Sequence, residues 1–471
     1  MTFAFTLPTT SPASFAASFS SSSAPSLPSA ASTRRAVYRD SLKRHKRLSP
    51  SEQTNGISSL QTTIDEYLPY LHTLDAYKTS QDVIQSSDFE TEWRATLSRR
   101  SGPAEAPRVR RKGLEYEICF ATATLAYTHA LRARSFIQAA LQSPPSDSSS
   151  TSSSEHMINQ ATQHMTTAAS IYLFLQNRAT AGERLTQQMP PDVTSSMYNA
   201  LWSLSLASAT LLAVLKQDPF PSIIAIQNDK NSKEWMYKAP TVPNSVKSKL
   251  LARLCMYSAD MASKAAAGVA ATPGSSPALQ SYCGDLVKTA KAKACRFLGV
   301  DAEVSGKLGE AIGWLLAGKE ILGMISAIDE DKGTLSRGLD KLKKAREERK
   351  IEKSHPEGLI AQDAGKTEEA MVLNELEKKW RKINDSVNFE TIPPTSSLIA
   401  MLPRGRPIFP ENQIWTPPKL SSSELVQLQN QAPNDGETDW LRADDSDDDI
   451  TPVAESSVPG GFPRSQSTGY Y

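Results

Sequence analysis

The chain has 471 residues, of which 39% are hydrophobic and 22% charged, enough to bury one large core or several smaller ones. Its 52 basic and 51 acidic residues leave a formal charge of +1. This argues against a protein that attracts nucleic acid through an overall positive electrostatic field. No unbroken run of about 18 apolar residues stands out, so we predict no membrane-spanning segment.

The N-terminal 33 residues are rich in Ser, Pro and Ala and contain no acidic residue. This composition allows two interpretations. The segment is either an organelle transit peptide or an extended arm on a folded body. The absence of arginine before Arg34 and the alternation of Phe3, Phe5 and Leu7, as in an edge strand, favour the arm.

From about residue 30 to residue 390, apolar residues recur at intervals of three and four. This spacing places them along one face of a helix. Sustained alternation of the strand type is absent, apart from the possible arm, and the pattern therefore predicts an all-α fold. The clearest sets begin at Ile57, Met157, Met197, Val246, Val304 and Leu373.

The domain organisation follows from changes in composition. Ser143–Ser154 (SPPSDSSSTSSS) is predicted to be a mobile loop, because it cannot fill a core. Leu114–Leu141 is apolar nearly all round, which indicates a helix between neighbours on both sides. We expect stacked helical hairpins without a fixed sequence period. Residues 1–410 are predicted to form this helical domain, and residues 411–471 a disordered tail rich in Pro, Ser and Asp.

One segment comes close to a nucleotide-binding motif. Gly313–Lys319 matches most of the P-loop pattern GxxxxGK[ST], but Glu320 replaces the Ser or Thr that would hold Mg²⁺. The apolar helical periodicity that begins at Val304 also continues through it. A contact between helices through small residues is therefore favoured over a phosphate site.

No other pattern points to catalysis or to a cofactor. The six histidines are scattered, with His156 and His164 eight residues apart and no HExxH sequence. The four cysteines form no CxxC pair, which is typical of buried thiols in a reducing compartment. We predict no metal, no cofactor, no small-molecule substrate and no catalytic residues, and hence not an enzyme.

Two stretches are strongly basic, Arg34–Arg47 and Arg99–Lys112. Either one could meet an anionic membrane surface or an acidic partner. The simpler interpretation, a solvated helix face or loop, is favoured.

Six segments, taken together and in order, resemble the Bro-type domain of Alix-like ESCRT-associated proteins, most closely those of fungal ambient-pH signalling. Their order and spacing are more specific than any one of them, and they span about residues 1–410. Leu206–Lys216 departs from the family's LAQAQE pattern at three positions. The segments are the N-terminal FTLPTTSPASFAASF with STRRAVYRDSLKRHKRLSP, Glu115–Phe120, Ala168–Leu175, Leu206–Lys216, Leu308–Ile312 and Asn384–Pro393.

The resemblance implies an elongated, curved domain with a tetratricopeptide-like core and a small N-terminal strand element. It implies a non-enzymatic adaptor that binds the C-terminal amphipathic helix of an ESCRT-III core subunit and links it to plasma-membrane pH-sensing complexes. There it would support proteolytic activation of the transcription factor PacC at alkaline pH. The expected location is the cytoplasm, with recruitment to plasma-membrane-associated or endosomal foci. The alternative is a generic helical-repeat scaffold or trafficking adaptor with another protein partner.

The mode of binding that follows is a partner helix laid in an apolar groove. Matching the family's docking positions onto this chain nominates Leu212, Leu215 and Leu315. Leu215 and Leu315 also continue inward-facing stripes, so a core role is favoured for both. Leu212 is rotated by about 100° from the stripe that contains Leu211, which makes it the strongest candidate for a solvent-facing anchor.

Overall fold

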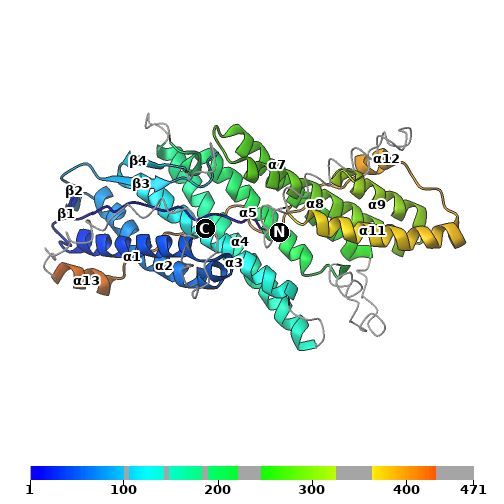
Figure 1. The fold of residues 1–471 in the computed structure, drawn as a ribbon, viewed down its shortest axis with the longest axis horizontal. Helices are drawn as coiled ribbons and strands as arrows, with labels where there is room; N and C mark the ends of the chain where they lie inside the picture. The colour runs from blue at the N-terminus through cyan, green and yellow to red at the C-terminus, as the bar shows by residue number, and fades with distance from the viewer. Residues whose placement is uncertain are drawn as a thin grey trace, which may run out of the picture.

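The structure is a computed structural model that describes residues 2–99, 106–142, 148–182, 189–220, 245–324 and 363–430. The described residues are mostly helical (Figure 1), which confirms the all-α prediction. The helices are α1 (Leu27–Arg47), α2 (Pro50–Thr79), α3 (Leu114–Gln142), α4 (Ser148–Gly182), α5 (Ser195–Leu215), α7 (Ser245–Ala271), α8 (Pro277–Val304), α9 (Leu308–Leu322), α11 (Lys366–Ile383), α12 (Thr395–Ala400) and α13 (Ser422–Asn430).

Short strands form two antiparallel pairs near the end of the molecule that holds α1. β1 (Phe19–Ser21) pairs with β2 (Val83–Gln85), and β3 (Glu90–Arg94) pairs with β4 (Arg108–Lys112). This is the small strand element that the family resemblance implies.

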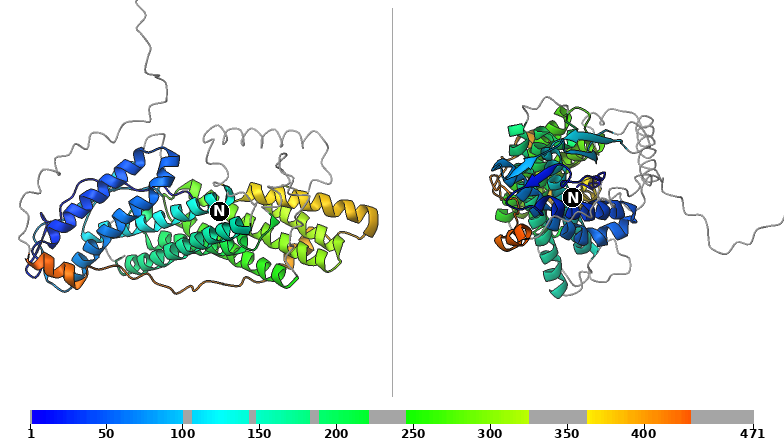
Figure 2. Two further views of the ribbon diagram at one scale, coloured as in Figure 1. Left: turned by 90° about the horizontal axis from the view of Figure 1, so that it is seen from below. Right: turned by 90° about the vertical axis from the view of Figure 1, so that its left-hand side faces the viewer.

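The long helices lie side by side and make an elongated body (Figures 1 and 2). Each helix from α3 to α9 packs against the next in the chain, and α11 packs against α8 and α9. One core runs from the N-terminal residues to α8, and a second joins α8, α9, α11 and α12. The helices end where their sequences dictate. Ser49 and Glu52 form a capping box at the start of α2, and Gly323 closes α9 in the left-handed conformation.

The N-terminal arm is part of the folded body. The Phe5 ring stacks on Tyr127 at 4.8 Å between centroids, and Phe3 lies edge-on to Tyr282 at 5.3 Å. Phe15 is fully buried. The arm interpretation is confirmed, although Phe3–Leu7 is extended without pairing in a strand.

A buried charged cluster joins α1, α2, β3 and α3. The Glu117 carboxylate has no exposed surface and accepts hydrogen bonds from Arg35 Nε at 2.8 Å, Tyr67 Oη at 2.8 Å and Trp93 Nε1 at 2.8 Å. Arg35 Nη1 also donates to the carbonyl of Ser11, which ties the arm to the helices. One carboxylate therefore holds four elements together.

A second buried cluster joins α8 to α11 and to the residues after α5. Arg296 Nε donates to Glu369 at 2.6 Å, and Arg296 Nη1 donates to Asp218 at 3.0 Å. Lys293 Nζ lies 2.7 Å from Glu369. All four side chains are buried, so their opposite charges compensate one another inside the protein.

The structure corrects two predicted boundaries. α4 begins at Ser148, so the second half of the expected Ser-rich loop is helical, while residues 143–147 lie outside the described residues. Residues 411–430 pack on the body and end in α13, so the described chain continues past the predicted domain boundary at 410. The rest of the predicted tail, 431–471, lies outside the described residues.

One described helix, α5, has the length and hydropathy of a membrane span, which the sequence analysis did not recognise. Within that apolar window, 78% of the residues are buried inside the protein. α5 packs between α4 and α7, and its composition is explained by this central position.

Candidate helix-docking surface

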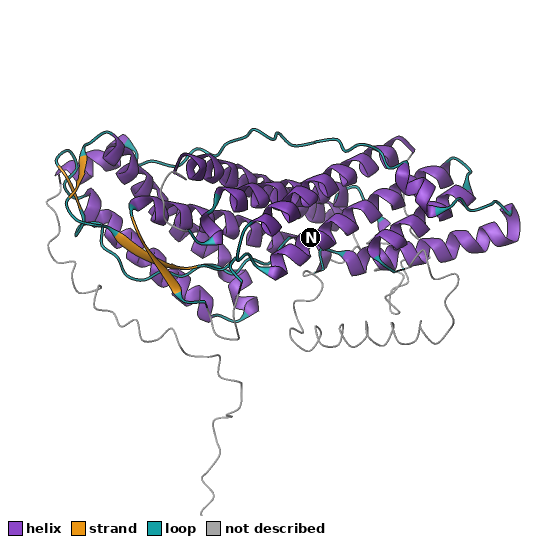
Figure 3. Cartoon of the chain, turned by 90° about the horizontal axis from the view of Figure 1, so that it is seen from above, coloured by secondary structure: helices purple, strands orange, loops and turns teal. Residues whose placement is uncertain are grey.

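A segment without helix or strand, residues 401–420, returns along the body from α12 to α13, and we call it the strap. It runs along the helices from α12 to the end of the molecule that holds β1 and β2 (Figures 2 and 3). Its main chain is anchored at three places, where Arg406 N–H donates to the carbonyl of Arg253, Trp415 N–H to that of Ser170, and Leu420 N–H to Thr73 Oγ1.

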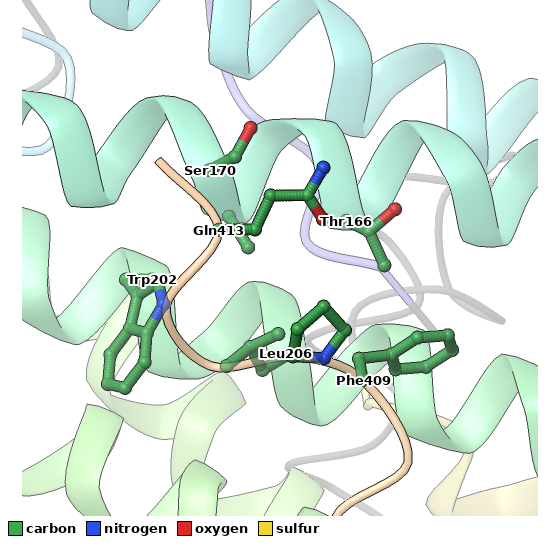
Figure 4. A pocket seen from close by; sticks show the side chains of 8 residues that line it. Thr166, Ser170, Trp202, Leu206, Phe409 and Gln413 are labelled. Carbon is green, nitrogen blue, oxygen red and sulfur yellow. The ribbon is translucent and has the colours of Figure 1, made fainter. Parts of the chain in front are cut away.

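The strap covers a shallow groove between α4 and α5. Thr166 and Ser170 line it from α4, Trp202 and Leu206 from α5, and Phe409 from the strap (Figure 4). The remaining space is about 10 Å³, which is room for about one water molecule. The groove is thus suited to chain packing and too small for a substrate.

Two isoleucines of the strap are exposed to solvent. Ile408 is 47% exposed and Ile414 is 52% exposed, while their neighbours in the chain, Phe409 and Trp415, are half-buried and pack against the large core. The Trp415 ring lies 5.3 Å from that of Phe174, which holds this part of the strap in place. We call the two exposed isoleucines, Ile408 and Ile414, the strap surface.

The three nominated docking residues do not form one surface. Leu212 has no exposed area and belongs to the large core, so the prediction that it faces solvent is wrong. Leu315 is also fully buried, in the second core, as its stripe indicated. Leu215 is half-buried at the end of α5. The prediction for Leu212 fails because α5 packs against both α4 and α7. A residue that points away from the stripe of Leu211 therefore lies on another buried face of the helix.

Replacement of Leu212 by Ala is expected to lower the free energy of unfolding by about 2–3 kcal/mol, because it leaves a cavity in a closed core. Leu215→Ala at the half-buried end of the same helix should cost about 1 kcal/mol or less. Urea denaturation followed by circular dichroism measures both. Equal losses would contradict the burial difference.

The sequence signal for the strap was present but weak. Trp415 and Leu420 are apolar residues in the Pro-rich stretch predicted to begin the tail, and Phe409 stands just before the predicted boundary at residue 410. Their contacts lie on helices hundreds of residues earlier in the chain, such as Thr73. Local spacing does not reveal such contacts.

The near-P-loop lies inside α9, as the helical interpretation expected. A Cβ atom on Gly313 would lie 2.8 Å from Leu398 of α12, so the glycine permits close helix contact. Lys319 forms an ion pair with Glu377 of α11. Gly313 and Lys319, which a phosphate site would need, are thus engaged in contacts with α12 and α11.

The structure brings together one histidine pair that sequence spacing missed. His129 Nδ1 and His164 Nδ1 lie 2.8 Å apart. Burial lowers the pKa of His129 to about 3 and that of His164 to about 4, so both rings are neutral near pH 7 and one donates to the other. Among the described residues, no group of three or more His, Cys, Asp or Glu side chains is placed to hold a metal ion.

The cysteines are core residues, as predicted. All four, Cys119, Cys255, Cys283 and Cys295, are buried and unpaired. Burial raises the pKa of the Cys283 thiol to about 12, which makes it unreactive at neutral pH.

The two basic stretches are used largely within the molecule. Arg35 is buried against Glu117, and Arg34 pairs with Glu66 at 2.8 Å. In the second stretch Arg110 pairs with Glu92. Contact of these stretches with a membrane stays a prediction.

Comparison with known proteins places this architecture in a family. No protein-family model matches the sequence. The chain is 37% identical to the pH-response regulator protein palC of Emericella nidulans, in an alignment that covers the whole of both chains. The chain belongs to the PalC family of pH-response regulators. A palC of Cryptococcus neoformans var. neoformans serotype D is 34% identical over 172 residues, 35% of this chain and 33% of that protein.

The fold of this PalC-family chain resembles that of a solved structure of ALIX. ALIX in complex with the SIVmac239 PYKEVTEDL late domain matches with a TM-score of 0.50 and 13% identity, over 88% of this chain and 49% of ALIX. An ALIX BRO1–CHMP4C complex matches with a TM-score of 0.48 and 13% identity, over 88% of this chain and 97% of that one. The curated and structural relatives are a regulator and a Bro1 domain, as the sequence resemblance indicated.

Proposed function

We propose that this protein is a non-enzymatic adaptor of the fungal ambient-pH pathway that binds the C-terminal amphipathic helix of an ESCRT-III core subunit. It links that subunit to plasma-membrane pH-sensing complexes and so supports proteolytic activation of PacC at alkaline pH. It works in the cytoplasm and is recruited to plasma-membrane-associated or endosomal foci. Membership of the PalC family supports the pathway, and the strap surface supports the mode of binding.

The observation that carries the docking mechanism is the pair of outward isoleucines on a segment that is itself fixed. Ile408 and Ile414 are each about half exposed, and the chain between them bends at Phe409 and turns at Glu411–Asn412. The two side chains are therefore closer together than they would be in an extended chain of the same length. Apolar anchors on a partner helix would meet these two isoleucines.

The rigidity of the strap matters because a preformed surface loses less conformational entropy when a partner binds. The Arg406 and Trp415 anchors lie on either side of Phe409, and Tyr257 Oη donates to Glu411 at 2.7 Å. The strap surface is therefore held from both ends and in the middle.

Binding should be measured between the full chain and a peptide of the C-terminal helix of an ESCRT-III core subunit, by calorimetry or anisotropy. The double variant Ile408→Asp and Ile414→Asp is expected to raise Kd by about tenfold or more, because two apolar anchors are lost. Val426→Asp on α13 is the matched control, since Val426 is equally exposed at 52% but lies outside the strap surface. Its Kd should be unchanged.

Unchanged affinity of the double variant would overturn the strap surface as the docking site. Absence of binding by the wild-type chain would instead favour the generic scaffold with another partner. The two outcomes are distinguishable, because only the second removes binding from every variant.

A further inference from the structure

The far end of α11 presents apolar side chains to solvent. Ile383 is 40% exposed, Val387 69% and Phe389 75%, and we call these three residues the α11 tip. They follow one another along the last turn of α11 and the π-helical turn Asn384–Asn388. This turn lies at one extremity of the long axis of the molecule, opposite the end that holds β1 and β2 (Figures 1 and 2).

The α11 tip is held in place by hydrogen bonds beneath it. Asn384 Nδ2 donates to the carbonyl of Glu390, and Glu390 N–H donates back to Asn384 Oδ1, both at 3.1 Å. The Glu390 carboxylate accepts from Gly309 N–H at 2.7 Å, which fixes the turn to the start of α9. These hydrogen bonds hold in place the turn that carries the three exposed apolar side chains.

Phe389 adopts a backbone conformation that a bulky residue rarely takes. Its φ is +50°, in the left-handed region, where Gly and Asn are favoured. A bulky aromatic side chain here is strained and gains little from packing, since three quarters of its surface faces water. Strain retained without a packing benefit indicates a function at that position.

The charge beside the α11 tip is positive. Lys378, Lys379 and Lys382 are exposed on the same end of α11, and none of them forms an ion pair with another described residue. Lys378 and Lys382 are four residues apart and so share one helix face. The exposed acids nearest to them in the chain are Glu375, three residues before Lys378, and Asp385, three residues after Lys382.

We propose that the α11 tip is a membrane-contact site, which places Val387 and Phe389 in the interface of an anionic lipid bilayer and the three lysines among its headgroups. Exposed aromatic and aliphatic residues flanked by lysines match the chemistry of peripheral insertion, with apolar burial and electrostatic attraction acting together. A protein partner fits less well, because lysine is depleted at the centres of protein interfaces. This site is independent of the strap surface.

The test uses the full-length protein and sedimentation with vesicles of phosphatidylcholine, with and without phosphatidylserine. The wild-type chain is expected to bind the anionic vesicles, and Val387→Ser with Phe389→Asn to weaken that binding by about tenfold or more. Asn is suited to the left-handed backbone, so the midpoint of thermal unfolding should stay unchanged or rise. Ile84→Ser on β2 is the matched control, because Ile84 is 65% exposed at the opposite end of the molecule.

Replacing Lys378 and Lys382 by Gln should weaken binding to anionic vesicles only, and should reduce its dependence on salt. The proposal is overturned if the wild-type chain does not bind anionic vesicles. It is also overturned if the Val387 and Phe389 variant binds as tightly as wild type, or if the Ile84 control loses as much affinity.

Discussion

Replacement of Glu117 by Gln is expected to lower the free energy of unfolding by about 3–5 kcal/mol, the largest loss for a single position in the N-terminal half. The neutral amide leaves the buried Arg35 guanidinium without its counter-charge. It also cannot accept from Arg35, Tyr67 and Trp93 as the carboxylate does. Urea denaturation followed by tryptophan fluorescence measures the loss.

Two further variants separate this effect from a general loss of charge. Glu66→Gln removes the partner of Arg34 in a pair whose side chains are 43% and 50% exposed, and should cost about 1 kcal/mol or less. Arg35→Met in the Glu117→Gln background should restore part of the stability, because it removes the uncompensated charge. A double variant less stable than Glu117→Gln would contradict the argument.

Arg296→Met is expected to cost a similar amount, about 3–5 kcal/mol at pH 7, at the other end of the molecule. The substitution leaves Asp218 and Glu369 buried with Lys293 as their remaining cation in this cluster. In the wild-type protein burial alone would raise the pKa of both carboxyls. The attraction of Arg296 and Lys293 outweighs it and holds both pKa values below their ordinary range.

The pH dependence distinguishes this cluster from simple loss of packing. In the wild-type protein the lowered pKa values contribute stability that is present above the ordinary carboxyl pKa and lost as pH falls through the lowered values. Without Arg296, burial should raise the pKa of a carboxyl, so proton uptake should partly restore stability as pH falls. The difference between wild type and variant should therefore shrink from pH 7 to about pH 5. A constant difference would indicate lost packing alone.

Much of the helical body could be predicted because each helix carries its own periodic signal. The stripe of Ile57, Leu60 and Ile64 is buried in α2 as its spacing indicated. The near-P-loop was interpreted as a helix for the same reason, and it lies in α9. Periodicity was sufficient wherever one face was apolar and the other polar.

The features that apolar periodicity did not predict depend on contacts between residues far apart in the sequence. Arg35 and Glu117 are 82 residues apart, and Arg35 was predicted within a basic stretch, whereas the structure buries it. The strap was missed because main-chain hydrogen bonds, such as that from Trp415 to Ser170, leave no side-chain pattern. Leu212 was misplaced because a helix that is apolar on every side has no stripe to mark its outward face.

The strap also has a mechanical consequence. In an array of stacked hairpins, each unit touches only its neighbours, so an end can fray without disturbing the far side. Here a single segment of chain is hydrogen-bonded in turn to α7, α4 and α2. Ser26 Oγ also donates to the Leu428 carbonyl, which holds α13 against the start of α1. Loosening α2, α4 or α7 would therefore also loosen the segment that joins all three, so we expect these helices to unfold together.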